Sequence, residues 1–444
     1  MVSEVSEDIG RGVLTSGFPG MVESESSEIG CLEIGYNLEL TENFVTKEEK
    51  QTKLLPSLRM IFWIFGIFYV WPDEGLQKNA LWWYRFKGIL FRMFFIYLSI
   101  ATQVAYNFTV TSRKELFSGV FILLTQLVMI MKMEFFYKNY AKIQKLVSRL
   151  EGKFYQLCSD EEKVPMERMR KETTVFWILY SFFSDVVITS WIAIAIINTI
   201  MIFPAWPIVD DSTPYGLYLV VIVYQYCCIL LNASFNISWD SLVAALLALT
   251  NAHLHRLQLQ LMKVGHQSTK KQKDFEAVTM ITSISHGKSA NNEVYNDLVQ
   301  CIIFHQEVTG FLRDVLQLFS GPMLAQLYCS VFILCITEFR LLTDVTTSTD
   351  IVKVLCYLIC LIIQVVQYCY FGNEIHYTSQ KVHQATAFMN YPDMDVRTRK
   401  VLITFQQLTA RGIQCRAKKM FAIELSMATF VTVSIMDGDN VLWI

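Results

Sequence analysis

The fold of this chain is decided by residues 215–252, which read YGLYLVVIVYQYCCILLNASFNISWDSLVAALLALTNA. These 38 positions contain a single charged residue, Asp240. A helix needs about 20 predominantly apolar residues to cross the hydrocarbon core of a bilayer. The stretch is therefore long enough to cross a membrane and to continue well beyond it.

Six further apolar stretches of membrane-spanning length accompany this one. They are Lys87–Phe108, Phe117–Tyr137, Thr173–Phe203, Leu298–Phe339, Val352–Phe371 and Ile423–Ile444. Hydrophobic residues make up 53% of the chain, against about 45–50% in an ordinary soluble domain. The sequence therefore predicts an all-α membrane protein with seven transmembrane helices.

The loops between these stretches alternate in their content of Lys and Arg. Basic residues are dense before the first stretch and within residues 138–171, 256–288 and 381–419. The loop at 203–215 has no Lys or Arg and carries two acidic residues. Because basic residues stay in the cytoplasm, the pattern predicts a cytoplasmic N-terminus, seven crossings and an outer C-terminus. A G-protein-coupled receptor has the opposite orientation.

The fourth and fifth stretches are about twice as long as a crossing requires. The fourth enters from outside, so its surplus at residues 238–261 projects into the cytoplasm with the apolar spacing of an amphipathic helix. The fifth begins with a similar segment at 296–319. An apolar helix face must pack on a partner. We predict an intracellular anchor bundle from the inner ends of helices four to seven, covering residues 238–320 and 372–420, which holds subunits together.

The first 53 residues are polar and rich in acidic side chains. They lack the apolar core of a secretory signal peptide, and their composition predicts a disordered cytoplasmic tail. A regulatory or partner-binding tail is the alternative. Residues 54–444 are expected to form one seven-helix domain. The net charge of −2 and the lack of a basic stripe predict that the chain does not bind nucleic acid.

No enzyme signature occurs in the sequence. There is no H-E-x-x-H, glycine-rich phosphate loop or G-x-S-x-G, and we expect neither catalysis nor a cofactor or metal. His253 and His255 are two positions apart and point to different faces of a helix, which predicts a helix surface rather than a metal site. His305 follows an apolar run, and we expect a buried structural hydrogen-bonding residue; a proton switch is the alternative.

Aromatic residues gather in the predicted outer halves of the helices. A mostly apolar pocket with a few polar groups suits a small volatile molecule, whereas ordinary packing and the interfacial aromatic belt are the alternatives. The candidate ligand-binding residues on these helices are Tyr106, Phe117, Phe121, Trp191, Tyr218, Ile222, Tyr224 and Tyr357. Asp185 lies within the third stretch, where a carboxylate is costly. It either orients a ligand or hydrogen-bonds to neighbouring Ser and Thr residues.

The last third of the chain carries the most specific motifs. The sixth stretch ends in YCYFGNE, residues 368–374, and Leu425-Ser426 and Thr429-Phe430 follow at a characteristic spacing. Three further features contribute to the resemblance described next: Trp71-Pro72, Pro204-Ala205-Trp206-Pro207, and Asp240 with His253. Over roughly residues 54–436 the chain resembles the insect odorant receptor family, in its divergent odour-tuning class.

The resemblance implies an odorant-gated, non-selective channel for monovalent and divalent cations in the plasma membrane, in the dendrites of olfactory sensory neurons. In this family tuning subunits form heterotetramers with a shared odorant co-receptor. The odorant occupies the outer half of the first six helices. The last span lines the pore, which here is the helix at 421–444 with Val433, Ile435, Val441 and Leu442.

The end of the chain departs from the family pattern. Met436-Asp437-Gly438-Asp439-Asn440 stands where the family has an apolar, aromatic tail. One interpretation is a pore whose carboxylates attract cations, and the other is a mis-predicted final exon. A gustatory receptor of the same fold and a secondary transporter are the alternative functions. A transporter would show inverted repeats and helices broken at mid-membrane.

Overall fold

The computed structural model of the chain describes residues 56–72, 78–109, 113–150, 160–207, 213–277, 283–343, 348–389, 391, 394–417 and 423–424. The chain divides into two units, Met1–Glu49 and Lys50–Ile444, and all described residues belong to the second. The tail predicted at 1–53 and the pore residues predicted after 424 lie outside these ranges.

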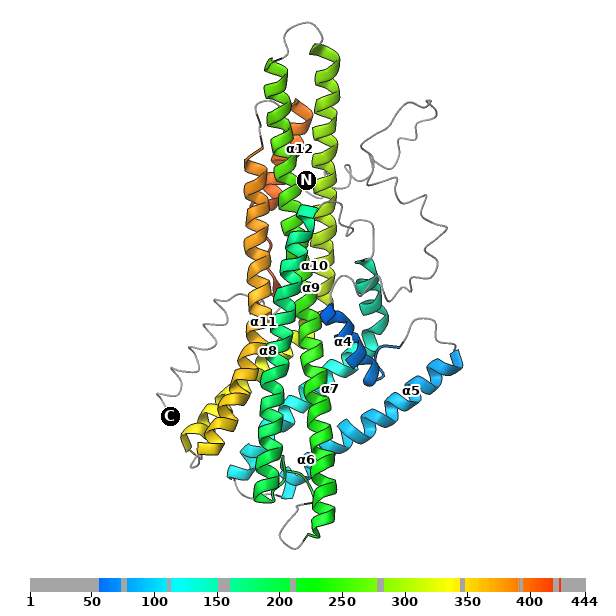
Figure 1. Cartoon of the computed structure of the whole chain (residues 1–444), viewed down its shortest axis with the longest axis vertical. Coiled ribbons are helices and arrows are strands. Elements are labelled where there is room, and N and C mark those ends of the chain that lie inside the picture. The colour runs from blue at the N-terminus through cyan, green and yellow to red at the C-terminus, as the bar shows by residue number, and fades with distance from the viewer. Residues whose placement is uncertain are drawn as a thin grey trace. The chain divides into compact units, whose positions relative to one another are not determined.

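The described part of the chain is built from helices (Figure 1). Their bounds are α4 Pro56–Ile67, α5 Lys78–Arg92, η1 Met93–Tyr97, α6 Leu98–Thr109, α7 Arg113–Arg149, α8 Asp160–Asn198, α9 Tyr215–Ala277, α10 Ser283–Thr343, α11 Ser348–Ala387 and α12 Val396–Thr409. A two-residue antiparallel pair joins β1 (Arg416–Ala417) to β2 (Ile423–Glu424). The helix predicted over 421–444 therefore does not begin at its expected start, because residues 423–424 are extended and paired.

Five of the described helical segments are long and apolar enough to cross a membrane. They are Asn79–Thr109, Asp160–Asn198, Tyr215–Gly265, Asn292–Ile336 and Leu355–Ala387. The chain is thus a multi-pass membrane protein. The first segment joins α5, the π-helical turn η1 and α6, and it begins before the predicted Lys87. The predicted second stretch lies within α7, a helix of 37 residues.

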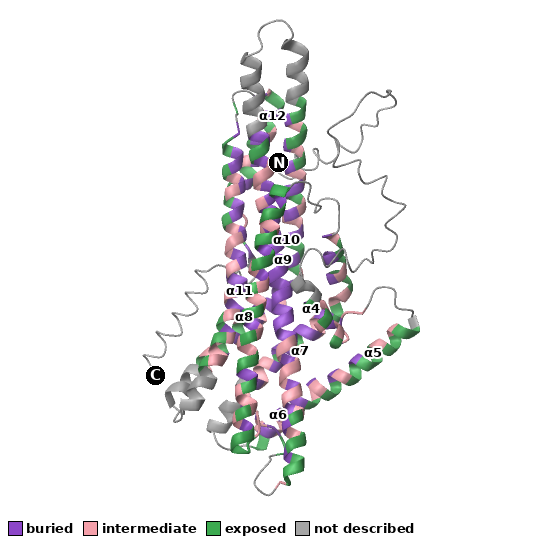
Figure 2. Ribbon diagram, viewed as in Figure 1, coloured by how far each residue is buried: buried purple, intermediate pink, exposed green. Residues whose placement is uncertain are grey.

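Helix α9 is the centre of the second unit. It packs against α8, α10 and α11, and its N-terminal half also contacts α4 and α7 (Figure 1). Residues 235–250 are buried without interruption, and Figure 2 shows this part of the molecule as continuously buried. The amphipathic pattern predicted for 238–261 is therefore wrong over its first half, because α9 is surrounded there by other helices rather than facing solvent.

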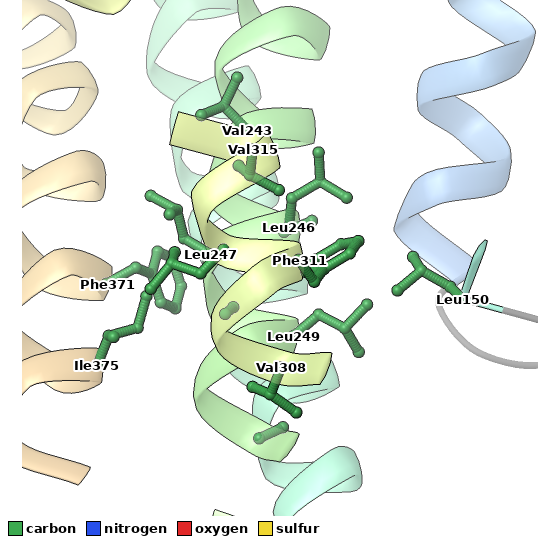
Figure 3. Close-up of a cluster of buried hydrophobic side chains, with 14 of the residues drawn as sticks. Leu150, Val243, Leu246, Leu247, Leu249, Val308, Phe311, Val315, Phe371 and Ile375 are labelled. Atoms are coloured by element: carbon green, nitrogen blue, oxygen red, sulfur yellow. The ribbon is translucent and has the colours of Figure 1, made fainter. Parts of the chain in front are cut away.

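The apolar core forms where α9, α10 and α11 meet (Figure 3). Val308, Phe311 and Val315 follow one another at spacings of three and four, which places them on one face of α10. They point toward α9, and Phe371 and Ile375 of α11 approach α9 from the other side. Each such side chain stabilises the fold by about 1.5–3 kcal/mol when fully buried.

Helix α12 packs against the C-terminal part of α11 and against α10. It begins after Asp395, whose side chain accepts a hydrogen bond from the backbone N–H of Thr398 at 3.1 Å. This is an N-cap, which satisfies one of the otherwise unpaired N–H groups of the first turn. Phe405 on the buried face of α12 contacts the ring of His305 on α10, with ring centroids 5.3 Å apart.

We predict that Asp395→Ala destabilises α12 by about 1 kcal/mol, the usual contribution of an N-cap acceptor. Hydrogen exchange of the α12 amides, measured by mass spectrometry on the purified protein, will show faster exchange in the variant. Asp395→Asn is the matched control, because its amide oxygen still caps the helix. Equal exchange in Asp395→Ala and the wild type would contradict the role of this cap.

Candidate ligand-binding site

A cavity of about 130 Å³ lies where five helices meet. Its lining comes from α7, α8, α9, α10 and α11. The apolar and aromatic part consists of Ile122, Tyr180, Val187, Ile188, Trp191, Ile229, Ile237, Tyr357 and Leu361. For comparison, an engineered apolar cavity of about 150 Å³ binds benzene. The cavity is therefore of the size of one small ring compound.

Two of the residues predicted from the sequence meet in this cavity, Trp191 of α8 and Tyr357 of α11. Their ring centroids are 6.1 Å apart and the rings are inclined by 34°. The Tyr357 hydroxyl forms a hydrogen bond with the Thr125 hydroxyl at 2.8 Å. This bond holds the Tyr357 ring at the cavity wall and ties α11 to α7.

Five other predicted residues do not line the cavity. One of them is Tyr224 of α9, whose hydroxyl donates to the Phe94 carbonyl at 2.7 Å. Tyr218 and Ile222 of α9 are buried with Ala195 in a separate cluster, and the Tyr218 hydroxyl donates to the Ala195 carbonyl at 2.8 Å. Tyr106 is buried on α6. Asp185 lies on an exposed face of α8, where Thr189 donates to its backbone carbonyl rather than to its carboxylate.

The remaining predicted residues fall outside what the structure describes. Phe117 and Phe121 lie on α7, but their side chains are not among the described ones. The predicted pore residues Val433, Ile435, Val441 and Leu442 lie beyond the last described position. Both groups stay predictions.

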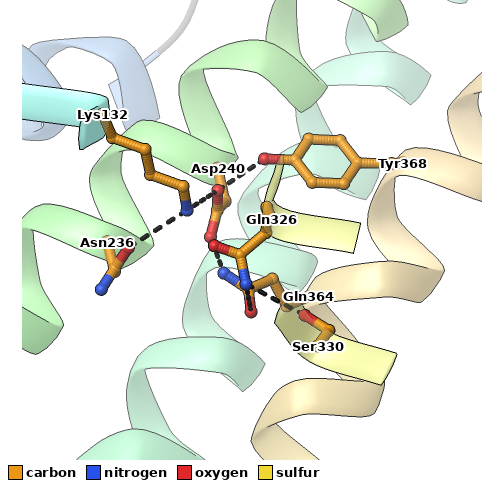
Figure 4. Close-up of polar contacts among 7 residues, drawn as sticks. All are labelled: Lys132, Asn236, Asp240, Gln326, Ser330, Gln364 and Tyr368. Atoms are coloured by element: carbon orange, nitrogen blue, oxygen red, sulfur yellow. Dashed lines mark hydrogen bonds and ion pairs between the residues drawn. The ribbon is translucent and has the colours of Figure 1, made fainter. Parts of the chain in front are cut away.

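The polar side of the cavity continues into a buried ion pair (Figure 4). The Lys132 Nζ of α7 lies 2.7 Å from the Asp240 Oδ1 of α9, and both side chains are completely buried. Lys132 also donates to the Asn236 Oδ1 at 3.1 Å. The Tyr368 hydroxyl and the Gln364 amide, both on α11, donate to the Asp240 carboxylate.

Hydrogen bonds connect this ion pair to the cavity itself. Gln326 of α10 donates to the Gln364 Oε1 at 2.9 Å and to the Ser330 hydroxyl at 3.0 Å. Asn236, Gln326 and Gln364 also line the cavity. The floor of the cavity is therefore bonded to Asp240, so a change in the cavity and a change in the packing of α9, α10 and α11 are linked.

Sequence reasoning missed this pair. The available signal was the single basic residue of the second apolar stretch, Lys132, and the single charged residue of the fourth, Asp240, because such residues are costly in a membrane unless they pair.

A larger hollow of about 390 Å³ lies between α8, α9 and α11. It is lined by charged side chains including Glu161, Arg168, Glu172 and Glu374, and Arg168 is paired with Glu172 at 2.8 Å. Several of these residues are exposed. A hollow lined by these charged side chains suits a small apolar ligand less well than the mostly apolar cavity where five helices meet.

The three histidines considered in the sequence show different environments. His253 is buried, with its ring edge-on to Phe304 at 6.0 Å, so its predicted place on a helix surface is wrong; α10 covers that face of α9. His255 is half-buried. His305 is buried as predicted, but its Nδ1 has no hydrogen-bond partner among the described residues. Within the described ranges, no cluster of three or more His, Cys, Asp or Glu side chains suits a metal ion.

We predict that Lys132→Met lowers the free energy of unfolding by about 3–5 kcal/mol, because Asp240 is left as a buried unpaired charge. Lys145→Met, which removes an exposed lysine from the same helix, is the control with little effect. The double variant Lys132→Met/Asp240→Leu should regain part of the lost stability. Thermal unfolding of the purified proteins in detergent measures all three. A wild-type unfolding temperature for Lys132→Met would rule out this role.

Comparisons with known proteins agree with this geometry. The family model for the 7tm Odorant receptor matches residues 112–436. The chain is 28% identical over 372 residues to Odorant receptor Or1 of Anopheles gambiae, covering 82% of this chain and 89% of that protein. It is 22% identical to Odorant receptor 2a of Drosophila melanogaster over 81% of this chain and 90% of that one.

Solved structures show the same fold. The olfactory receptor OR5 of Machilis hrabei superposes with a TM-score of 0.69 at 11% identity, covering 88% of this chain and 98% of that one. Its complex with eugenol gives a TM-score of 0.70 at 12% identity, with 87% and 97% covered. The family match over most of the chain, together with the shared helical fold, shows that this protein belongs to the insect odorant receptor family.

Proposed function

We propose that this chain is the odorant-binding tuning subunit of a heteromeric, ligand-gated, non-selective cation channel. The observation that carries the proposal is the cavity formed by α7–α11, with Trp191 and Tyr357 on its wall. A small, mostly apolar cavity with few polar groups matches a volatile ligand. The site of action is the plasma membrane of olfactory neuron dendrites, where the chain assembles with the shared co-receptor.

The ligand acts by favouring one of two arrangements of the helices. A molecule in the cavity contacts α7, α8, α9 and α11 at once and also touches Gln326 of α10. It shifts the equilibrium toward the arrangement that it binds more tightly. Because Gln326 and Gln364 are bonded to each other and Gln364 to Asp240, the shift reaches the packing of α9 against α10 and α11.

The proposed topology has seven crossings with the N-terminus in the cytoplasm. The five apolar helical segments of the structure supply five crossings, α7 supplies the second, and the residues after β2, 425–444, supply the last. This last segment is the proposed pore helix, with Val433, Ile435, Val441 and Leu442 facing the cations. Asp437 and Asp439 would then attract cations to the pore.

The proposed anchor for the co-receptor comprises residues 238–320 and 372–420. Several contacts support a rigid inner bundle. Arg256 of α9 pairs with Glu162 of α8 at 3.0 Å, with both side chains buried. Arg149 of α7 contacts Glu307 and Asp314 of α10, each at 2.7 Å. These links, together with α12 packed on α10 and α11, give the bundle the fixed shape that subunit assembly requires.

Trp191→Ala tests the ligand site directly. The variant enlarges the cavity and removes ring contacts, so we expect the half-maximal concentration of an active odorant to rise by at least about tenfold. The measurement is odour-evoked current in oocytes that express the chain with the co-receptor, challenged with a panel of volatiles. Current without the co-receptor would contradict the tuning-subunit assignment.

Trp82→Ala is the matched control for that experiment. Trp82 lies on α5, is 59% exposed and does not line the cavity. We expect the odorant to be as potent on this variant as on the wild type, with the same surface expression. An equal loss of potency in both variants would place the ligand elsewhere.

An epitope tag at the N-terminus tests the orientation. Because the basic loops predict a cytoplasmic N-terminus, antibody should label the tag only after the cells are permeabilised. A tag at the C-terminus is the control and should be labelled on intact cells. Labelling of the N-terminal tag on intact cells would overturn the proposed topology.

A further inference from the structure

Two polar groups on the cavity wall lack hydrogen-bond partners within the described part of the chain. Asn232 of α9 is 6% exposed, and neither its Oδ1 nor its Nδ2 has a partner. Gln126 of α7 is 3% exposed and accepts a hydrogen bond from Gln103 at 2.8 Å, but its Nε2 has no partner. Both residues line the cavity.

The other amides of the cavity are already engaged. Asn236 accepts from Lys132, and Gln326 and Gln364 are bonded to each other. The Thr125 hydroxyl is bonded to Tyr357. Among the described amides of this cavity, Asn232 is the one with both polar atoms buried and unpaired, and Gln126 has a buried, unpaired Nε2. A buried amide without a partner is costly, so the two residues mark where a polar group of a ligand is favoured.

We propose that Asn232, together with Gln126, is the specificity-determining pair of the cavity and selects a compact apolar ligand that carries a hydroxyl group. The hydroxyl donates to the Asn232 Oδ1 and accepts from the Gln126 Nε2 or the Asn232 Nδ2. Its hydrocarbon body packs against Trp191 and the aliphatic wall. The inference rests on the proposed function, because it names the ligand class of that same cavity.

The donor and acceptor pattern sets the order of affinity for ligands of one shape. An alcohol satisfies both kinds of group, a ketone can only accept, and a hydrocarbon leaves all of them unpaired. A site built to bond a hydroxyl discriminates strongly against an analogue that lacks it. We expect cyclohexanol to bind at least about tenfold more tightly than methylcyclohexane, with cyclohexanone between them. These rings match the size of the cavity.

The test uses the full chain, purified in detergent, and the stabilisation of thermal unfolding by each of the three compounds. Apparent dissociation constants come from the concentration dependence of the unfolding temperature. In Asn232→Leu the preference for cyclohexanol over methylcyclohexane should disappear. The unliganded variant should unfold at or above the wild-type temperature, because a buried unpaired amide has been removed.

Asn198→Leu is the matched control. Asn198 is the exposed last residue of α8 and does not line the cavity, so the same chemical change there should leave the preference intact. Equal affinities of the wild type for cyclohexanol and methylcyclohexane would overturn the inference and would mean that water satisfies Asn232. Failure of both compounds to bind, or an unchanged preference in Asn232→Leu, would also overturn it.

The binding series separates this inference from the proposed function. A preference for the alcohol that depends on Asn232, without any odour-evoked current, would uphold the inference and contradict the channel function. Odour-evoked current in which alcohol and hydrocarbon are equally potent, and which Asn232→Leu leaves unchanged, would uphold the channel function and contradict the inference. The comparison within the wild type needs no variant, so it stays decisive even where a variant folds poorly.

Discussion

The ion pair between Lys132 and Asp240 is the interaction on which the arrangement of the helices depends. Both side chains are completely buried, and an isolated charge at such a position would cost several kcal/mol. Each charge is therefore stable there only beside its partner, and this requirement fixes α7 against α9. Tyr368 and Gln364 add α11 to the same carboxylate, and Gln326 adds α10 through Gln364. A single buried carboxylate thus sets the relative position of four helices.

The candidate ligand cavity is a consequence of this arrangement. Its floor consists of amides that belong to the Asp240 network, and its walls are aromatic and aliphatic side chains from α7, α8, α9 and α11. The network makes the floor rigid, since its members are bonded to one another. Asn232 and Gln126 line the same cavity outside this network, with hydrogen-bonding capacity unused. Asn236, Gln326 and Gln364 thus belong both to the cavity lining and to the helix-packing network, which in the proposed function is a physical route from ligand binding to gating.

Helix α9 links the level of the cavity to the proposed anchor bundle. It contributes Asn232 and Asn236 to the cavity, Asp240 to the ion pair and Arg256 to the buried pair with Glu162. All of these contacts lie along one uninterrupted helix, Tyr215–Ala277. The similarity of the fold to OR5 of Machilis hrabei at 11% identity is consistent with a structure specified by apolar pattern and a few polar contacts rather than by most individual residues.

The sequence alone determined that the chain is a helical membrane protein of the odorant receptor family, because the length of apolar stretches and the spacing of the YCYFGNE motif are local properties. It also identified Trp191 and Tyr357 as ligand candidates. Only the tertiary structure decided that these two meet in one cavity while Tyr218 and Asp185 do not. The burial of His253 and the pairing of Lys132 with Asp240 also came from the tertiary structure. The reason is physical. Periodicity tells which face of a helix is apolar, but which residues pack against that face depends on the arrangement of the helices. Lys132 and Asp240 are 108 residues apart in the sequence, so no local pattern pairs them.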